Sequence, residues 1–146
     1  MKRQEYLDLK KKHEQELSDF PIAYAFNDEQ LKEALVKLGA DSVKECVSVF
    51  GHGDMVRKGD SSKLIDMLTR HTEEIKRKLQ DDPEFAKEAF RYEMDNHEYA
   101  INWDGDGDVL AAFAINWADI VKWGLHPVWS AARKEHYKMM EEFGVI

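Results

Sequence analysis

Apolar residues recur at three- and four-residue steps along most of the chain, which is the period of amphipathic helices. The first such stretch ends before Pro21, and Gly39 closes the second, which begins at the capping residue Asn27. Pro83 and Pro127 stand in the first turns of two later stretches. The pattern predicts helices over about residues 3–19, 27–38, 61–80, 83–102, 109–117 and 127–143, with an irregular helical stretch over 117–124.

Two segments lack this period. Residues 20–26 form an extended apolar segment, either a short strand or a packed connector. Residues 46–58 contain two β-prone runs around Gly51-His-Gly-Asp54, which is typical of a hairpin. We therefore predict a mainly α protein, a compact single-domain helical fold (residues 1–146) of five to six helices with one small β-hairpin.

The composition fits one globular domain. The chain has 146 residues, 43% of them hydrophobic and 34% charged, which excludes a wholly disordered or low-complexity chain. Its one cysteine, Cys46, has no partner for an internal disulfide. Neither an apolar run long enough for a membrane span nor a signal-peptide apolar region is visible, so we expect a soluble, cytoplasmic protein without membrane contact.

The negative charge is concentrated in one window. The net charge is −8, and residues 81–108 account for all of it, with ten acidic and two basic groups. Such a window repels phosphate backbones and attracts a basic protein surface, so we expect no direct nucleic-acid binding through it. A solvated surface that only maintains solubility is the open alternative. The candidate partner-binding residues are Glu84, Glu88, Asp95, Glu98, Asp104 and Asp106.

A carboxylate and an imidazole lie within the apolar stripe of the helix predicted over 83–102. On a helical wheel Glu93 and His97 fall on the same side as Phe90, whereas Arg91, Asp95 and Glu98 fall on the outer side. A structural hydrogen-bonded Glu93–His97 pair is the preferred interpretation, and a metal site or acid–base catalysis are the alternatives.

Three further histidines bear on the metal alternative. His13, His71 and His136 each fall on the apolar stripe of a different predicted helix, and they could converge with Glu93 and His97. However, the Glu-x-x-His pairs of di-iron bundles and the His-Glu-x-x-His motif are missing. We therefore expect no cofactor, with a divalent metal as the less favoured possibility.

The remaining motifs do not indicate a reaction. Asp104, Asp106 and Asp108 alternate with glycine, but Val109 and Ile115 stand where an EF-hand needs glycine and glutamate. We expect an Asx-rich turn that caps the next helix. No phosphate loop and no Ser-, Cys- or Thr-centred catalytic motif is found. All four tryptophans lie in the last 44 residues, and one exposed beside the acidic window would create a binding surface.

Three segments carry a resemblance: residues 20–26 (Phe-Pro-Ile-Ala-Tyr-Ala-Phe), the glycine-rich turn leading to Val56-Arg-Lys58, and residues 92–99 (Tyr-Glu-Met-Asp-Asn-His-Glu-Tyr). Together they resemble a family of small uncharacterised acidic proteins from phages and mobile elements of anaerobic bacteria. The resemblance covers most of the chain and is weakest over 104–130. It implies a genetic context, and its segments match no catalytic signature, so it assigns no site residues.

Three functions remain open. The first is a non-enzymatic protein-interaction module that binds a basic surface, in a phage context an inhibitor of a host nucleic-acid or defence protein. The second is a metal-dependent or acid–base enzyme centred on Glu93 and His97. The third is a homo-oligomeric structural protein. The sequence favours the first.

Overall fold

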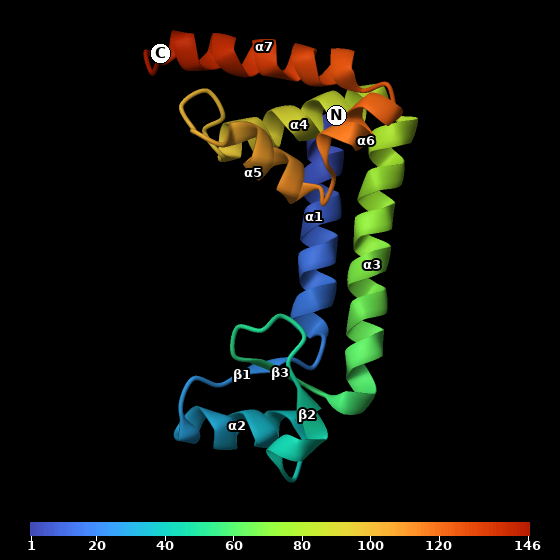
Figure 1. Ribbon diagram of the computed structural model, residues 1–146, viewed down its shortest axis with the longest axis vertical. Coiled ribbons are helices and arrows are strands. Elements are labelled where there is room, and N and C mark those ends of the chain that lie inside the picture. The colour runs from blue at the N-terminus through green and yellow to red at the C-terminus, as the bar shows by residue number, and fades with distance from the viewer. The chain divides into compact units, whose positions relative to one another are not determined.

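The computed structural model describes residues 1–146 and shows a mainly α protein with a small antiparallel sheet, which confirms the predicted fold class (Figure 1). The helices and strands are, in chain order, α1 (Lys2–Asp19), β1 (Ala23–Tyr24), α2 (Asp28–Leu38), the 3-10 helix η1 (Val43–Glu45), β2 (Cys46–Val47), β3 (Asp54–Arg57), α3 (Lys58–Asp81), α4 (Pro83–Asn96), α5 (Gly105–Ala112), α6 (Trp117–Lys122) and α7 (His126–Glu142). Not one of these helices combines the length and the apolarity that crossing a bilayer would require.

The chain divides into two units, which are described separately. Unit 1 comprises Met1–Lys11 and Thr72–Ile146, and unit 2 comprises Lys12–His71. The long helices α1 and α3 contribute residues to both units. Each unit has hydrophobic clusters of its own.

The core of unit 1 forms around α4. Asp82 caps this helix by accepting a hydrogen bond from the Phe85 amide at 3.1 Å, and Pro83 occupies the first turn. The buried face of α4 includes Phe90, whose ring centroid lies 5.4 Å from that of Phe113 and 5.1 Å from that of Trp129. Because α4 packs against both α5 and α7, it is buried on more than one side (Figure 1).

Unit 2 contains the sheet, in the order β1-β3-β2. The predicted hairpin is formed by β2 and β3, with Val47 opposite Val56. β1, from the segment predicted as a strand or a connector, adds a third antiparallel strand with Ala23 opposite Met55. Because α2 packs against β1 and β3, Ala34 of α2 and Ala23 of β1 are buried in the same hydrophobic cluster. Val56 of β3 belongs to a second hydrophobic cluster.

Several helix boundaries differ from the prediction. The helix predicted over 83–102 ends at Asn96, because Glu98 takes a left-handed conformation with φ of 53° that the helix cannot continue. The next helix starts at Gly105 rather than 109 and ends at Ala112 rather than near 117, where the separate helix α6 begins. α3 starts at Lys58 rather than 61, directly after β3, with no loop between them. The capping and turn residues in the sequence therefore did not predict these helix boundaries correctly.

The hairpin loop of unit 2 is organised by one buried carboxylate. Asp54 is 2% exposed and accepts hydrogen bonds from the Ser48 hydroxyl at 2.8 Å and from the amides of Val49, Phe50 and His52 at 2.8, 3.0 and 3.2 Å. Burial alone would raise the pKa of Asp54, but these four donors outweigh it and lower the pKa far below its ordinary value. The sequence showed Asp54 only as a turn residue.

This geometry predicts a pH-dependent contribution to stability. Because the folded-state pKa of Asp54 is depressed, its contribution is complete above the unfolded-state pKa of about 3.9 and is lost as the pH falls from there through the folded-state pKa. Asp54→Asn should lower the free energy of unfolding by about 2 kcal/mol at pH 7, and the difference from wild type should shrink below about pH 4. Urea unfolding followed by circular dichroism measures it, with the exposed Asp66→Asn as control. A pH-independent difference would contradict this account.

Candidate functional site

The chain between α4 and α5 forms an ordered loop, residues 97–104, called here the α4–α5 loop (Figure 1). Asn102 holds it together: its side-chain amide donates to the His97 carbonyl at 2.9 Å and to the Asp108 carboxylate at 2.7 Å. Its amide oxygen accepts from the Asp104 backbone at 2.9 Å. The Ala100 amide donates to Nε2 of His136 on α7 at 3.0 Å. The loop is therefore tied both to itself and to the core of unit 1.

On this loop the Trp103 side chain is 100% exposed. Ile101 is also exposed, and the acidic residues Glu98, Asp104 and Asp106 lie on the surface beside them in the chain. An indole that packs against nothing contributes no core stability, whereas Trp is enriched among residues that dominate protein interfaces. The structure thus meets the condition set by the sequence, an exposed tryptophan within the acidic window.

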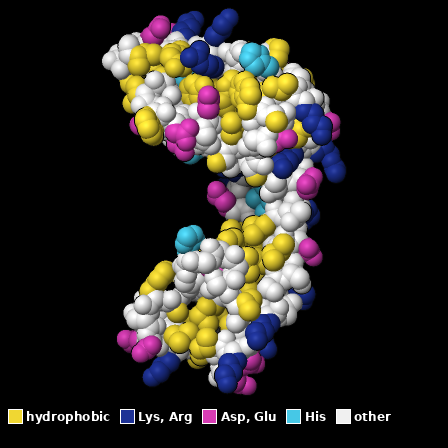
Figure 2. Space-filling view, viewed as in Figure 1, with side chains coloured by type: hydrophobic (Ala, Val, Ile, Leu, Met, Phe, Trp, Pro, Cys, Tyr) yellow, Lys and Arg dark blue, Asp and Glu magenta, His cyan; other side chains and the backbone are white.

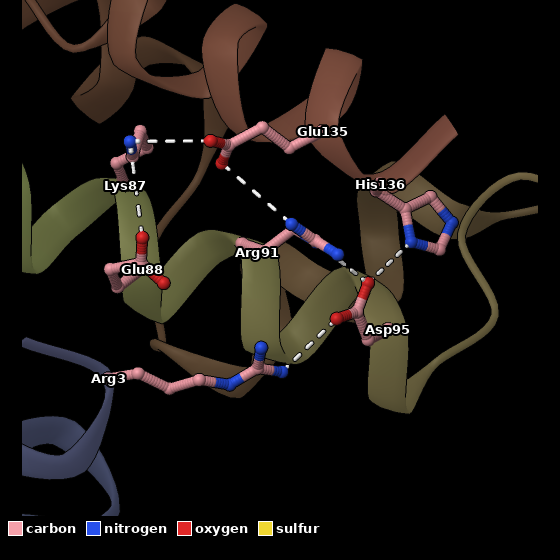
Figure 3. Close-up of polar contacts among 7 residues, drawn as sticks. All are labelled: Arg3, Lys87, Glu88, Arg91, Asp95, Glu135 and His136. Atoms are coloured by element: carbon pink, nitrogen blue, oxygen red, sulfur yellow. Dashed lines mark hydrogen bonds and ion pairs between the residues drawn. The ribbon is translucent and has the colours of Figure 1, made fainter. Parts of the chain in front are cut away.

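Asp95 has a different environment from the one expected. It was predicted on the outer face of α4, but it accepts hydrogen bonds from Arg3 and Arg91, both at 3.1 Å, and lies 2.7 Å from Nδ1 of His136 (Figure 3). Although burial opposes it, these three donors lower the pKa of Asp95. The outer-face prediction for Asp95 and Arg91 is wrong because α7 covers this side of α4.

The Asp95 network continues along the contact of α4 with α7. Glu135 of α7 lies 3.4 Å from Lys87 and 3.9 Å from Arg91, and Lys87 lies 3.9 Å from Glu88 (Figure 3). His136 is fully buried, donates through Nδ1 to Asp95 and accepts the Ala100 amide through Nε2, so both ring nitrogens are used within the fold. The sequence placed His136 on the stripe of its helix but could not name these partners.

Glu93 is 1% exposed, as its position on the wheel predicted, but its hydrogen-bond partner is Lys10 of α1 at 3.0 Å. His97 Nε2 lies 3.9 Å from the carboxylate, beyond hydrogen-bond distance, and its side chain is partly exposed. The Lys10 ammonium also lies over the rings of Tyr6 and Tyr92, at 5.4 and 5.3 Å from their centroids. Burial, with Glu93 nearby, raises the pKa of Tyr6. The partner of Glu93 thus came from outside the predicted helix.

His13 and His71 lie in unit 2, whereas Glu93 and His97 lie in unit 1. The two imidazoles are stacked, with centroids 4.0 Å apart and planes 11° from parallel. His71 Nε2 is 3.4 Å from a Glu16 oxygen, and burial lowers the pKa of His71. No group of three or more His, Cys, Asp or Glu side chains is arranged to hold a metal ion.

The six candidate partner-binding residues do not form one continuous patch. Glu84 and Glu88 lie beside Lys2 and Arg3, about 20 Å and about 13 Å along α4 from the α4–α5 loop. On the face of unit 1 seen in Figure 2, acidic side chains are interspersed with basic and hydrophobic ones. Among the six candidates, Asp104 and Asp106 line one surface hollow together with Trp103, and Glu98 lies five residues before Trp103 in the chain.

The comparisons with known proteins identify a family. Residues 5–135 match the family of unknown function DUF7659, and the chain belongs to that family. This agrees with the expected resemblance to an uncharacterised family. No curated protein and no solved structure matches the chain.

Proposed function

We propose that this chain is a non-enzymatic protein-interaction module that binds a basic protein surface through its α4–α5 loop. The observation that supports the proposal is the fully exposed side chain of Trp103 on a loop held by the hydrogen bonds of Asn102 and His136. A rigid loop loses little conformational entropy when a partner binds, so burying the indole contributes to affinity.

The acidic residues near Trp103 define the partner's charge. Glu98, Asp104 and Asp106 are exposed, and they would speed association with a cationic surface and disfavour an anionic one. The same charges repel phosphate backbones, which argues for a protein partner rather than DNA or RNA. Asp95 is not included in this surface because its charge is already matched by Arg3 and Arg91.

The resemblance to phage and mobile-element proteins extends the proposal to the role of an inhibitor. Host enzymes and defence proteins that act on nucleic acid carry basic surfaces for phosphate backbones. A small acidic protein with an apolar anchor suits such a surface. On this proposal, DNA and the chain compete for the partner. The alternative of an enzyme centred on Glu93 and His97 has no comparable observation in its favour, since the Lys10 ammonium already donates a hydrogen bond to the Glu93 carboxylate.

A comparative capture experiment tests the proposed function. Immobilised wild-type chain and its Trp103→Ala variant are incubated with a lysate of the organism that carries the gene, and the captured proteins are compared by mass spectrometry. We expect at least one basic protein that wild type retains and the variant loses by roughly 30-fold, the effect of a typical interface hot spot. Adding salt should weaken the wild-type interaction.

The control is Val36→Ala, which removes another exposed apolar side chain, in unit 2. It should retain the same proteins as wild type. Equal capture by wild type and Trp103→Ala, or no specific capture by wild type, would overturn the proposal.

A further inference from the structure

The α4–α5 loop is attached to α7 through one buried histidine. The Ala100 amide donates to Nε2 of His136 at 3.0 Å, and the His136 ring is 0% exposed. The Tyr99 ring packs edge-on against this imidazole and against the ring of Tyr137, at centroid distances of 5.9 and 6.3 Å. All these residues belong to unit 1. The position of the loop on α7 therefore depends on His136.

The loop needs such an attachment because its own backbone is strained. Glu98 has a φ of 53°, a left-handed conformation that residues other than glycine rarely adopt and that neighbouring contacts must stabilise. At the other end of the loop, Asp104 stands at the N-cap of α5 but its side chain makes no capping hydrogen bond. The capping role expected of these aspartates is therefore not performed by Asp104. The bond from Ala100, two residues after Glu98, is one of the contacts that offset the strain.

This bond exists only while the imidazole is neutral. A backbone amide can only donate, so Nε2 of His136 must carry a lone pair and the ring proton must lie on Nδ1. Nδ1 lies 2.7 Å from the Asp95 carboxylate, which accepts that proton's hydrogen bond (Figure 3). An imidazolium carries a proton on both nitrogens, so its Nε2–H would point at the Ala100 N–H. Two donors cannot bond each other, and protonation therefore removes the attachment.

The surroundings of the ring leave His136 as the group that titrates near neutral pH. The charged and titratable groups around it are Asp95 with its partners Arg3 and Arg91, Tyr99 with its partner Asp106, and on α7 Arg133, Glu135 and Tyr137. Asp95 favours the imidazolium, but two guanidiniums already balance its charge. The pKa of Asp95 is lowered by its donors and that of Tyr99 is raised by burial, so neither changes charge between about pH 5.5 and pH 7.5.

We propose that His136 is the positioning residue of the α4–α5 loop and that its protonation releases the loop from α7. The neutral ring holds Trp103 on an ordered loop. Once released, the loop must lose more conformational entropy when a partner binds, so the affinity falls. The inference deepens the proposed function by adding its regulation, and the effect on binding rests on that function, whereas the release of the loop does not.

The first test uses the ¹⁵N-labelled full chain alone, between about pH 7.5 and pH 5.5, where histidines ordinarily titrate. The ring nitrogen signals of His136 report its protonation, and hydrogen exchange of the Ala100 amide, relative to an unstructured peptide, reports the attachment. We expect protection of Ala100 to fall about tenfold, the effect of one lost hydrogen bond, with the midpoint of the His136 titration. The control is the Ala86 amide, which donates to the Asp82 carbonyl at 2.9 Å and should stay protected.

Two variants separate His136 from the histidine on the loop itself. His97 has a partly exposed side chain, so His97→Gln should keep the pH response of Ala100. His136→Gln should abolish it, because the amide oxygen can accept from Ala100 and does not titrate in this range. The inference would be overturned if wild-type Ala100 stayed protected while His136 became protonated, or if His136 stayed neutral down to about pH 5.5. These wild-type measurements decide the matter even if His136→Gln does not fold.

The second test repeats the protein capture at the two ends of this pH range. Proteins whose capture depends on Trp103 should be retained several-fold less by wild type at the lower pH, and equally at both by His136→Gln, which controls for titration of the captured proteins. If Ala100 is released as expected but capture is the same with and without Trp103, the positioning role stands and the proposed function is wrong. If capture depends on Trp103 but Ala100 stays protected, the proposed function stands and the positioning role is wrong.

Discussion

Replacing Lys10 with Met lowers the free energy of unfolding by about 3 kcal/mol, the usual cost of removing one partner of a buried ion pair. Glu93 is 1% exposed and receives a hydrogen bond from Lys10 at 3.0 Å. Methionine keeps a flexible, unbranched side chain beside Tyr6 and Tyr92, whose rings the Lys10 ammonium contacts, but removes the charge. The carboxylate then loses its hydrogen-bonded cation and keeps only His97, whose Nε2 lies 3.9 Å away, beyond hydrogen-bond distance. Urea unfolding followed by tryptophan fluorescence measures the change, because all four tryptophans lie in unit 1.

The matched control is Lys11→Met, which removes the neighbouring, exposed ammonium and should change stability little. The double variant Lys10→Met with Glu93→Leu should recover most of the loss, because no charge then remains buried. The prediction would be contradicted if Lys10→Met were as stable as wild type, or if the double variant were no more stable than Lys10→Met. Either result would show that the Lys10–Glu93 pair does not contribute this free energy of unfolding.

Replacing Phe90 with Ala should cost about 4 kcal/mol of unfolding free energy, within the range for large aromatic residues in a core. Phe90 is completely buried and packs against Phe113 and Trp129, at centroid distances of 5.4 and 5.1 Å. Its removal leaves a cavity that three helices surround, so the neighbours cannot close it without losing their own contacts. Denaturant unfolding at neutral pH gives the value.

Trp103→Ala is the matched comparison within the same unit. It removes a still larger aromatic side chain, but one that is fully exposed, and should change stability by less than about 0.5 kcal/mol. If Trp103→Ala were as destabilising as Phe90→Ala, the indole would have a structural role and the interaction surface would lose its basis.

The helical pattern was predictable because α4 and α7 bury apolar residues that recur at three- and four-residue steps. The start of α4 followed from Asp82 and Pro83, residues whose local chemistry favours a helix N-terminus. The end of α4 could not be predicted in this way, because the apolar pattern continues to Ile101. In the structure, residues 97–104 form a loop in which the Asn102 side chain donates to the His97 carbonyl. Apolar spacing alone cannot distinguish a helix from a loop in which an exposed apolar residue such as Ile101 continues the same spacing.

The candidate site was predictable only in part. The wheel placed Glu93 inside correctly, because burial of one face follows from its neighbours, Phe90 and Met94. It placed Asp95 on the solvent-exposed face of α4, which is wrong. A helical wheel of α4 alone cannot show that α7 brings His136 into contact with Asp95 on that face. The exposure of Trp103 could not be derived from sequence at all, since tryptophan spacing fits a core as well as a surface.

The most direct test of the account is the affinity of a purified captured protein for wild type and for Trp103→Ala, measured by calorimetry after unfolding experiments have shown both chains equally stable. We expect a roughly 30-fold weaker interaction for the variant and a salt-sensitive interaction for wild type. Equal affinities for the two chains would contradict it.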